Sequence, residues 1–138
     1  MFQFDKIKLV IWDLDETLWH GTLSEENVII PEETAGLIRT LTDIGIVNSI
    51  CSKNDPEPVK TRLEEAGLWD YFVFPSVNWE SKGARTKQLI EDMALRNVNV
   101  LFLDDNPSNR EEVRYFCSGI MVDGPEAIPE LLTKAEAA

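Results

Sequence analysis

Short apolar runs rich in β-branched and aromatic residues alternate along the whole chain with segments whose apolar residues recur at helical spacing. Strands that alternate with helices of about 10–15 residues predict βαβ units, and therefore a parallel, doubly wound α/β sheet. The length of 138 residues suits a single domain, 1–138, with one core. The predicted strands are residues 7–12 (IKLVIW), 46–51 (IVNSIC), 71–74 (YFVF), 98–103 (VNVLFL) and 118–122 (SGIMV).

Helix start and stop signals occupy the segments between these runs. Residues 32–45 form the first predicted helix, which Pro31 starts and Gly45 closes. Asp55 and Asn106, each followed by proline, are predicted N-caps of later helices.

Two segments lie outside the regular alternation of strands and helices. Residues 20–31 interrupt it and are expected to form a hairpin or flap. Residues 133–138 (TKAEAA) are expected to be a frayed tail.

The charge balance excludes several classes of partner. The chain carries 13 basic and 25 acidic residues, a net charge of −12, which repels nucleic-acid backbones and anionic lipid. We therefore expect neither nucleic-acid nor membrane partners, and no apolar run reaches the roughly 18–20 residues of a membrane helix. The N-terminal stretch lacks a signal-peptide pattern, and Cys51 and Cys117 suit two buried thiols in a reducing compartment. A cytoplasmic location follows as an expectation.

Polar clusters fall at or near the ends of the predicted strands, where ligands bind in open α/β sheets. An Asp after a strand is commonly only a turn former or helix cap. Several acids that converge on one edge need a cation, because like charges gathered there repel. The clusters are Asp13-Leu14-Asp15-Glu16-Thr17, Ser52-Lys53-Asn54, Lys82 and Asp104-Asp105-Asn106.

These residue types suit one chemistry. Oxygen ligands without suitable His or Cys partners favour Mg²⁺ over zinc. A carboxylate can attack phosphorus, and a second carboxylate two residues on can transfer protons. A lysine and a serine hydroxyl can stabilise the phosphoryl oxygens. The sequence therefore predicts Mg²⁺-dependent phosphoryl transfer.

The sequence Asp13-Leu14-Asp15-Glu16-Thr17 after an apolar strand resembles the DxDx(T/V) signature of the haloacid dehalogenase (HAD) superfamily. Ser52, Lys82 and the Asp104-Asp105 pair match the second, third and fourth motifs in the expected order, so the resemblance covers residues from about 7 to 117. It implies a HAD-like Rossmannoid three-layer sandwich with a central, mainly parallel sheet.

The resemblance also implies roles for the four acids. Asp13 would be the nucleophile and a Mg²⁺ ligand. Asp15 would be the general acid/base, and its backbone carbonyl would be a second ligand. Asp104 would complete the metal site, with Asp105 as a ligand or a neighbour of one.

Ser52 and Lys82 would bind the phosphoryl group, with Lys53 and Asn54 as further candidates for phosphate binding. Lys87 is a rival to Lys82, but Lys82 has the favoured place in NWESKG at the start of a predicted helix. Ser52 could also simply cap a turn.

Longer stretches resemble one subclass, IIIC, which lacks a cap domain and includes FkbH-like proteins and magnesium-dependent phosphatases. These stretches are DLDETLWHGTL, CSKNDP, NWESKG and FLDDNPSNREEV. His20 departs from this pattern, in which glycine is common. About 35 residues separate Thr17 from Ser52, too few for a cap once a helix and a strand are placed, so an open site is expected.

Phosphomonoester hydrolysis through phospho-Asp13 is the function that we expect. Its substrate would be a phosphorylated small molecule or a carrier-protein or macromolecular substrate. One alternative is an FkbH-like component that loads glyceryl or acyl units onto acyl carrier protein. The other is a non-hydrolytic assembly domain. The sequence leaves the oligomeric state open.

Five individual residues keep two interpretations each. Trp19 and Trp79 either flank the opening of the site or pack partly buried. His20 is either a surface or flap residue or takes part in proton transfer. Asn109, with its neighbour Ser108, fits the start of a helix better than a metal shell.

Overall fold

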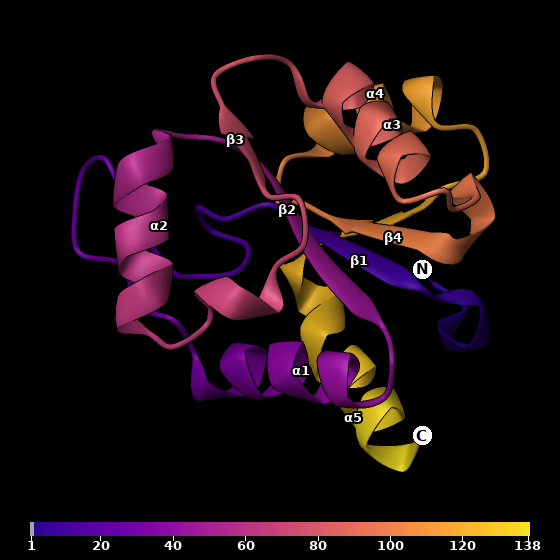
Figure 1. Cartoon of the computed structure of the whole chain (residues 1–138), viewed down its shortest axis with the longest axis horizontal. Coiled ribbons are helices and arrows are strands. Elements are labelled where there is room, and N and C mark those ends of the chain that lie inside the picture. The colour runs from indigo at the N-terminus through magenta and orange to yellow at the C-terminus, as the bar shows by residue number, and fades with distance from the viewer. Residues whose placement is uncertain (1) are drawn as a thin grey trace.

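A computed structural model describes residues 2–138 and contains one five-stranded, fully parallel sheet (Figure 1). The strand order is β3-β2-β1-β4-β5, as expected for a doubly wound α/β fold. The strands are β1 (Leu9–Trp12), β2 (Val47–Lys53), β3 (Ser76–Asn78), β4 (Val100–Leu103) and β5 (Met121–Asp123). The helices are α1 (Glu32–Asp43), α2 (Pro56–Glu65), α3 (Lys82–Asp92), α4 (Pro107–Phe116) and α5 (Ile128–Ala137).

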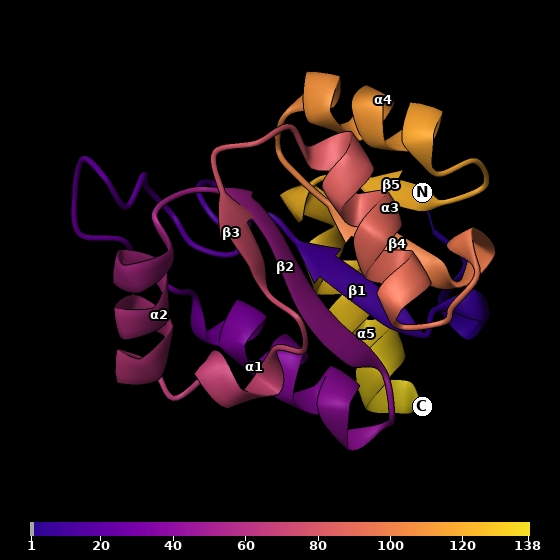
Figure 2. The ribbon, with the colours of Figure 1, turned by 45° about the horizontal axis from the view of Figure 1, so that its top comes forward.

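Helices cover both faces of the sheet and make three layers. Figure 2 shows α3 and α4 on one face and α1 and α5 on the other. Helix α2 contributes to the same hydrophobic cluster as α1 and α5. The central strand β1 is buried along its whole length, and its side chains alternate between the two faces. Val10 and Trp12 belong to the cluster under α1 and α5, and Leu9 and Ile11 to the cluster under α3 and α4.

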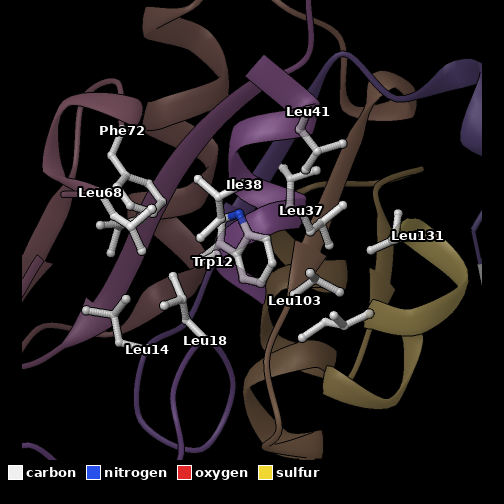
Figure 3. Packing of buried hydrophobic residues seen from close by; sticks show 14 of the residues in the cluster. Trp12, Leu14, Leu18, Leu37, Ile38, Leu41, Leu68, Phe72, Leu103 and Leu131 are labelled. Atoms are coloured by element: carbon white, nitrogen blue, oxygen red, sulfur yellow. The ribbon is translucent and has the colours of Figure 1, made fainter. Parts of the chain in front are cut away.

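Trp12 lies at the centre of the larger cluster, next to Ile38 from α1 and Leu103 from β4 (Figure 3). Its indole N–H donates to Asn48 Oδ1 at 2.8 Å, and the Asn48 amide donates to the Ile38 carbonyl oxygen at 3.0 Å. These buried hydrogen bonds link β1, β2 and α1 to one another.

The prediction of a strand at Tyr71–Phe74 is wrong. Tyr71 ends a short 3₁₀ helix, and the strand β3 begins only at Ser76. Phe72 makes an isolated parallel bridge to Asn48. Phe74 then adopts a left-handed φ of 50°, and Pro75 supplies no N–H for a ladder. The apolar run is therefore broken, and the edge strand resumes beyond the proline.

Two smaller expectations concern the ends of helices. Asn106 caps α4, accepting from the backbone N–H groups of Ser108 and Asn109, whereas Asp55 holds the N-cap position of α2 without a capping hydrogen bond from its side chain. Its carboxylate accepts from Trp79 Nε1 at 2.8 Å and, among the described residues, caps no N–H of α2. Helix α5 includes most of the segment 133–138, since it continues to Ala137.

Residues 20–31 form a loop closed by an antiparallel bridge. The His20 N–H donates to the Ile29 carbonyl oxygen at 2.8 Å, and the Ile29 N–H donates back at 3.1 Å. Within residues 2–138 no further domain covers this end of the sheet. Loops and the first turns of α3 and α4 therefore surround the carboxyl ends of β1 and β4.

Candidate active site

The site is built where β1 and β4 end side by side, at the point where the order of the strands reverses. Trp12 pairs with Leu103 in the parallel ladder, and the next residue of each strand is an aspartate. The Asp13 N–H donates to the Leu103 carbonyl oxygen at 2.9 Å, which places Asp13 beside Asp104. Both side chains are buried.

Lys82, the first residue of α3, lies between the two acids. Its Nζ is 2.6 Å from Asp13 Oδ1 and 2.7 Å from Asp104 Oδ2, and its side chain is 3% exposed. Burial acts to lower the pKa of Lys82, but the two carboxylates raise it above its ordinary value, so the ammonium stays charged. Lys82 thus lies beside Asp13 and Asp104, whereas its rival Lys87 lies exposed further along α3.

Asp13 is the acid whose ionisation this environment disfavours. Burial raises the pKa of Asp13 from 3.8 to about 7, with Lys82 opposing the rise and Asp104 adding to it. A strongly shifted acid in contact with a buried cation at the carboxyl edge of a sheet is typical of functional sites.

A third acid joins the pair. Carboxylate oxygens of Asp13, Asp104 and Asp105 lie within 4.8 Å of one another, and Asp105 is exposed. Thr17 links two of them, because its Oγ1 lies 2.8 Å from Asp13 Oδ2 and 3.1 Å from Asp105 Oδ1. The donor set is all carboxylate oxygen, which fits a hard cation such as Mg²⁺.

Asp15 lies outside this cluster and is held by three donors. Its Oδ1 accepts from Trp19 Nε1 at 2.9 Å and from the Leu23 N–H at 3.0 Å. Its Oδ2 accepts from Asn54 Nδ2 at 3.0 Å. Three hydrogen bonds on one half-buried carboxylate hold it in one orientation.

The cluster Ser52-Lys53-Asn54 forms the end of β2 and the residue after it. Ser52 is buried, and Lys53 is exposed. The Asn54 amide contacts Asp15, which favours a role in holding that acid, and its binding of phosphate stays a prediction.

The two tryptophans and His20 take different places. Trp19 is completely buried and donates to Asp15, whereas Trp79 is 61% exposed and tethered to Asp55. His20 is a surface residue at the base of the loop.

Sequence reasoning missed several residues that support these side chains. Asn109 lies at the start of α4 as its sequence position predicts, and its N–H donates to Asn106 Oδ1, but its side-chain amide also donates to Asp104 Oδ2 at 3.2 Å. Arg110 Nη1 donates to the Asp104 carbonyl oxygen at 2.8 Å. Thr17 differs from these residues, because it is the last residue of the DxDx(T/V) motif and the sequence therefore points to it. The contacts of Arg85 with Ser52 gave no signal in the sequence, because they join separate segments.

No protein-family model matches the chain, and no curated protein sequence matches it significantly. Solved structures do match. The phosphatase-domain part of the protein BF1531 from Bacteroides fragilis, complexed with Mg, is 26% identical with a TM-score of 0.81. That match covers 94% of this chain and 40% of the other, so the chain spans less than half of that structure.

Two further structures match almost the whole chain at lower identity. The cobalt-bound deoxy-D-mannose-octulosonate 8-phosphate phosphatase from Haemophilus influenzae is 16% identical over 97% of this chain and 91% of its own, with a TM-score of 0.73. A HAD-superfamily hydrolase from Ehrlichia chaffeensis is 13% identical over 99% of both chains, with a TM-score of 0.71. The chain has the HAD-like fold. The resemblance seen in the motifs thus extends to the three-dimensional structure. The three similar structures are named as phosphatases or a hydrolase.

Within residues 2–138, none of the helices of this HAD-like fold is both long and apolar enough to cross a membrane.

Proposed function

We propose that the chain is a Mg²⁺-dependent phosphomonoesterase that works through a phospho-Asp13 intermediate. The observation that carries the proposal is the buried ammonium of Lys82 between Asp13 and Asp104, with Asp105 beside them. Buried ion pairs of this kind are weak sources of stability, so function explains them better than folding does. The Mg-bound phosphatase domain from Bacteroides fragilis supports the same reaction and the same metal.

The carboxylates suit the metal. Asp13, Asp104 and Asp105 would hold Mg²⁺, with the Asp15 backbone carbonyl as a further candidate ligand. When bound, Mg²⁺ would neutralise charge on the transferring phosphoryl group.

In the proposed reaction, an ionised Asp13 oxygen attacks phosphorus, and the bond between phosphorus and the leaving oxygen breaks. The Asp15 carboxyl group gives its proton to that oxygen. The Asp15 carboxylate then takes a proton from water as the water oxygen attacks phosphorus. The bond from phosphorus to Asp13 breaks, which releases inorganic phosphate and restores both acids.

Lys82 and Ser52 would stabilise the phosphoryl oxygens during both steps. Lys82 brings a full positive charge that is already desolvated, and such a charge acts strongly where water is excluded. It also favours the ionised form of Asp13 that the attack requires, because the ammonium opposes part of the effect of burial on the Asp13 pKa.

The alternatives have weaker support. None of the comparisons supports the loading of acyl carrier protein. A purely structural domain would have no need for a buried lysine between two buried acids, since apolar residues of similar volume are often as stabilising.

The test is the release of inorganic phosphate from a panel of small phosphomonoesters, each assayed with Mg²⁺ and with EDTA. Wild type and D13N are compared, with D43N as the matched control because Asp43 is an exposed residue at the end of α1. We expect turnover by wild type and D43N with Mg²⁺ only. Turnover by D13N at the wild-type rate would refute the covalent mechanism.

A further inference from the structure

Ser52 and Lys82, which would bind the phosphoryl group, are here called the phosphoryl pocket. The guanidinium group of Arg85 joins three segments around this pocket. Its Nη2 donates to the carbonyl oxygens of Ser52 and Ser76, both at 2.8 Å. Its Nε donates to Ser76 Oγ at 3.1 Å, and its Nη1 to the Glu80 carbonyl oxygen at 2.7 Å. One side chain thus ties the end of β2 and the start of β3 to the loop that leads into α3.

Arg85 and Lys82 stand on the same face of α3, because residues three apart on a helix are neighbours. Lys82 reaches Asp13 and Asp104, while Arg85 reaches Ser52. The first turn of α3 therefore contacts both the acids after β1 and β4 and the end of β2.

The acceptors explain why arginine suits this position. All four are carbonyl or hydroxyl oxygens, so the contacts are directional hydrogen bonds and not an ion pair. The bond to the Ser52 carbonyl also fixes the planar peptide group between Ser52 and Lys53. A planar fork with five N–H donors can serve these acceptors together, whereas a lysine ammonium is a single point with three donors.

The positive charge of Arg85 is also felt at the end of β2. Burial raises the pKa of the Cys51 thiol, and Arg85 is the strongest of the groups that oppose this rise, ahead of Lys82. Arg85 therefore places a charge, as well as hydrogen bonds, next to the segment that carries Ser52.

We propose that Arg85 is the positioning residue of the phosphoryl pocket: it fixes Ser52 at the end of β2 relative to Lys82 on α3. This inference rests on the proposed phosphatase function. Misplacement of a binding group by about 1 Å lowers rates by up to roughly 100-fold, so loss of Arg85 should be visible in kinetics even in a folded protein.

The experiment compares wild type, R85Q, R85K and S76A, with K87Q as the matched control because Lys87 is an exposed cation on the same helix. Hydrolysis of p-nitrophenyl phosphate with Mg²⁺ gives kcat and KM, and competition by inorganic phosphate gives an inhibition constant. Circular dichroism and thermal unfolding report whether each variant is folded at the assay temperature.

We expect R85Q to raise the inhibition constant of phosphate about tenfold and to lower kcat/KM by about 10- to 100-fold. R85K should remain at least fivefold impaired, because it keeps the charge but loses the fork. S76A removes only the Ser76 hydroxyl that accepts from Arg85 Nε, and it should raise the inhibition constant of phosphate about threefold. K87Q should match wild type.

Each contrary result has a distinct meaning. R85Q could be less stable and yet keep the wild-type kcat, KM and phosphate inhibition constant once these are corrected for the folded fraction. That result would refute the inference and leave the proposed function standing. If R85K binds phosphate as well as wild type does, charge and not positioning is responsible, and the inference is again refuted. If R85Q does not fold, R85K and S76A decide the question by the same criteria. If wild type neither hydrolyses the ester nor responds to phosphate, the proposed function fails and the inference falls with it.

Discussion

Replacing Asp13 by asparagine should stabilise the metal-free protein while it abolishes activity. Burial raises the pKa of Asp13 from 3.8 to about 7 in the folded protein, so between these values the folded state binds more protons than the unfolded state. The stability associated with the neutral carboxyl is fully present below about pH 4 and is lost as the pH rises through about 7.

The size of this effect follows from the shift. About three pKa units at 1.36 kcal/mol each give an upper bound near 4 kcal/mol for the loss of stability between pH 4 and pH 8. This bound already includes the attraction of the Lys82 ammonium, because that charge contributes to the Asp13 pKa of about 7. Asparagine has the same shape as the carboxyl group and never ionises. We therefore expect D13N to exceed wild type by roughly 2–4 kcal/mol at pH 8, and to match it near pH 4.

Urea unfolding in EDTA at pH 4, 6 and 8 measures this difference directly. The excess stability of D13N should grow with pH, and saturating Mg²⁺ should then stabilise wild type more than D13N, because ligands stabilise the state that binds them. D13N that is no more stable than wild type at pH 8, or an excess that does not change with pH, would refute the reasoning.

Four further outcomes are expected. EDTA should remove phosphatase activity and Mg²⁺ restore it in a phosphate-release assay, whereas recovery with zinc alone would contradict the oxygen ligand set. D15N should lower kcat by about 100- to 10,000-fold with little change in inhibition by phosphate; an unchanged kcat would remove Asp15 from proton transfer. In thermal unfolding, G83A should destabilise the protein by about 1–3 kcal/mol, because a Cβ there would lie 2.3 Å from the Phe116 ring. G36A, with open space in α1, should instead stabilise it by about 0.5–1 kcal/mol, and equal effects of the two changes would contradict the packing argument.

Periodicity and chain order were enough to predict the parallel sheet and its helices, because buried parallel strands read as continuous apolar runs. The third strand was the exception. The run Tyr71–Phe74 has the composition of a strand, and nothing local shows that its backbone turns to a left-handed φ at Phe74. The strand that forms instead, Ser76–Asn78, is short and mostly polar, and it is specified by its pairing with β2.

The meeting of Asp13, Lys82 and Asp104 could be predicted, because each lies at a strand end or helix start on one edge of the sheet. The orientation of side chains around them could not. Asn54 was predicted to bind phosphate and is found against Asp15, and Arg85 is bonded to segments that are distant in sequence. Such contacts depend on rotamers and loop paths, which motif spacing does not encode.

The central position of β1 has a consequence for synthesis on the ribosome. Its two neighbours are β2 and β4, and β4 begins only at Val100. When the first half of the chain has left the ribosome, one edge of β1 therefore still lacks its partner. The strand becomes enclosed only after Leu103 has emerged, and the next residue to follow is Asp104. Closure of the sheet and completion of the acid cluster are thus one late event, so a nascent chain that ends before β4 has neither a closed core nor a complete acid cluster.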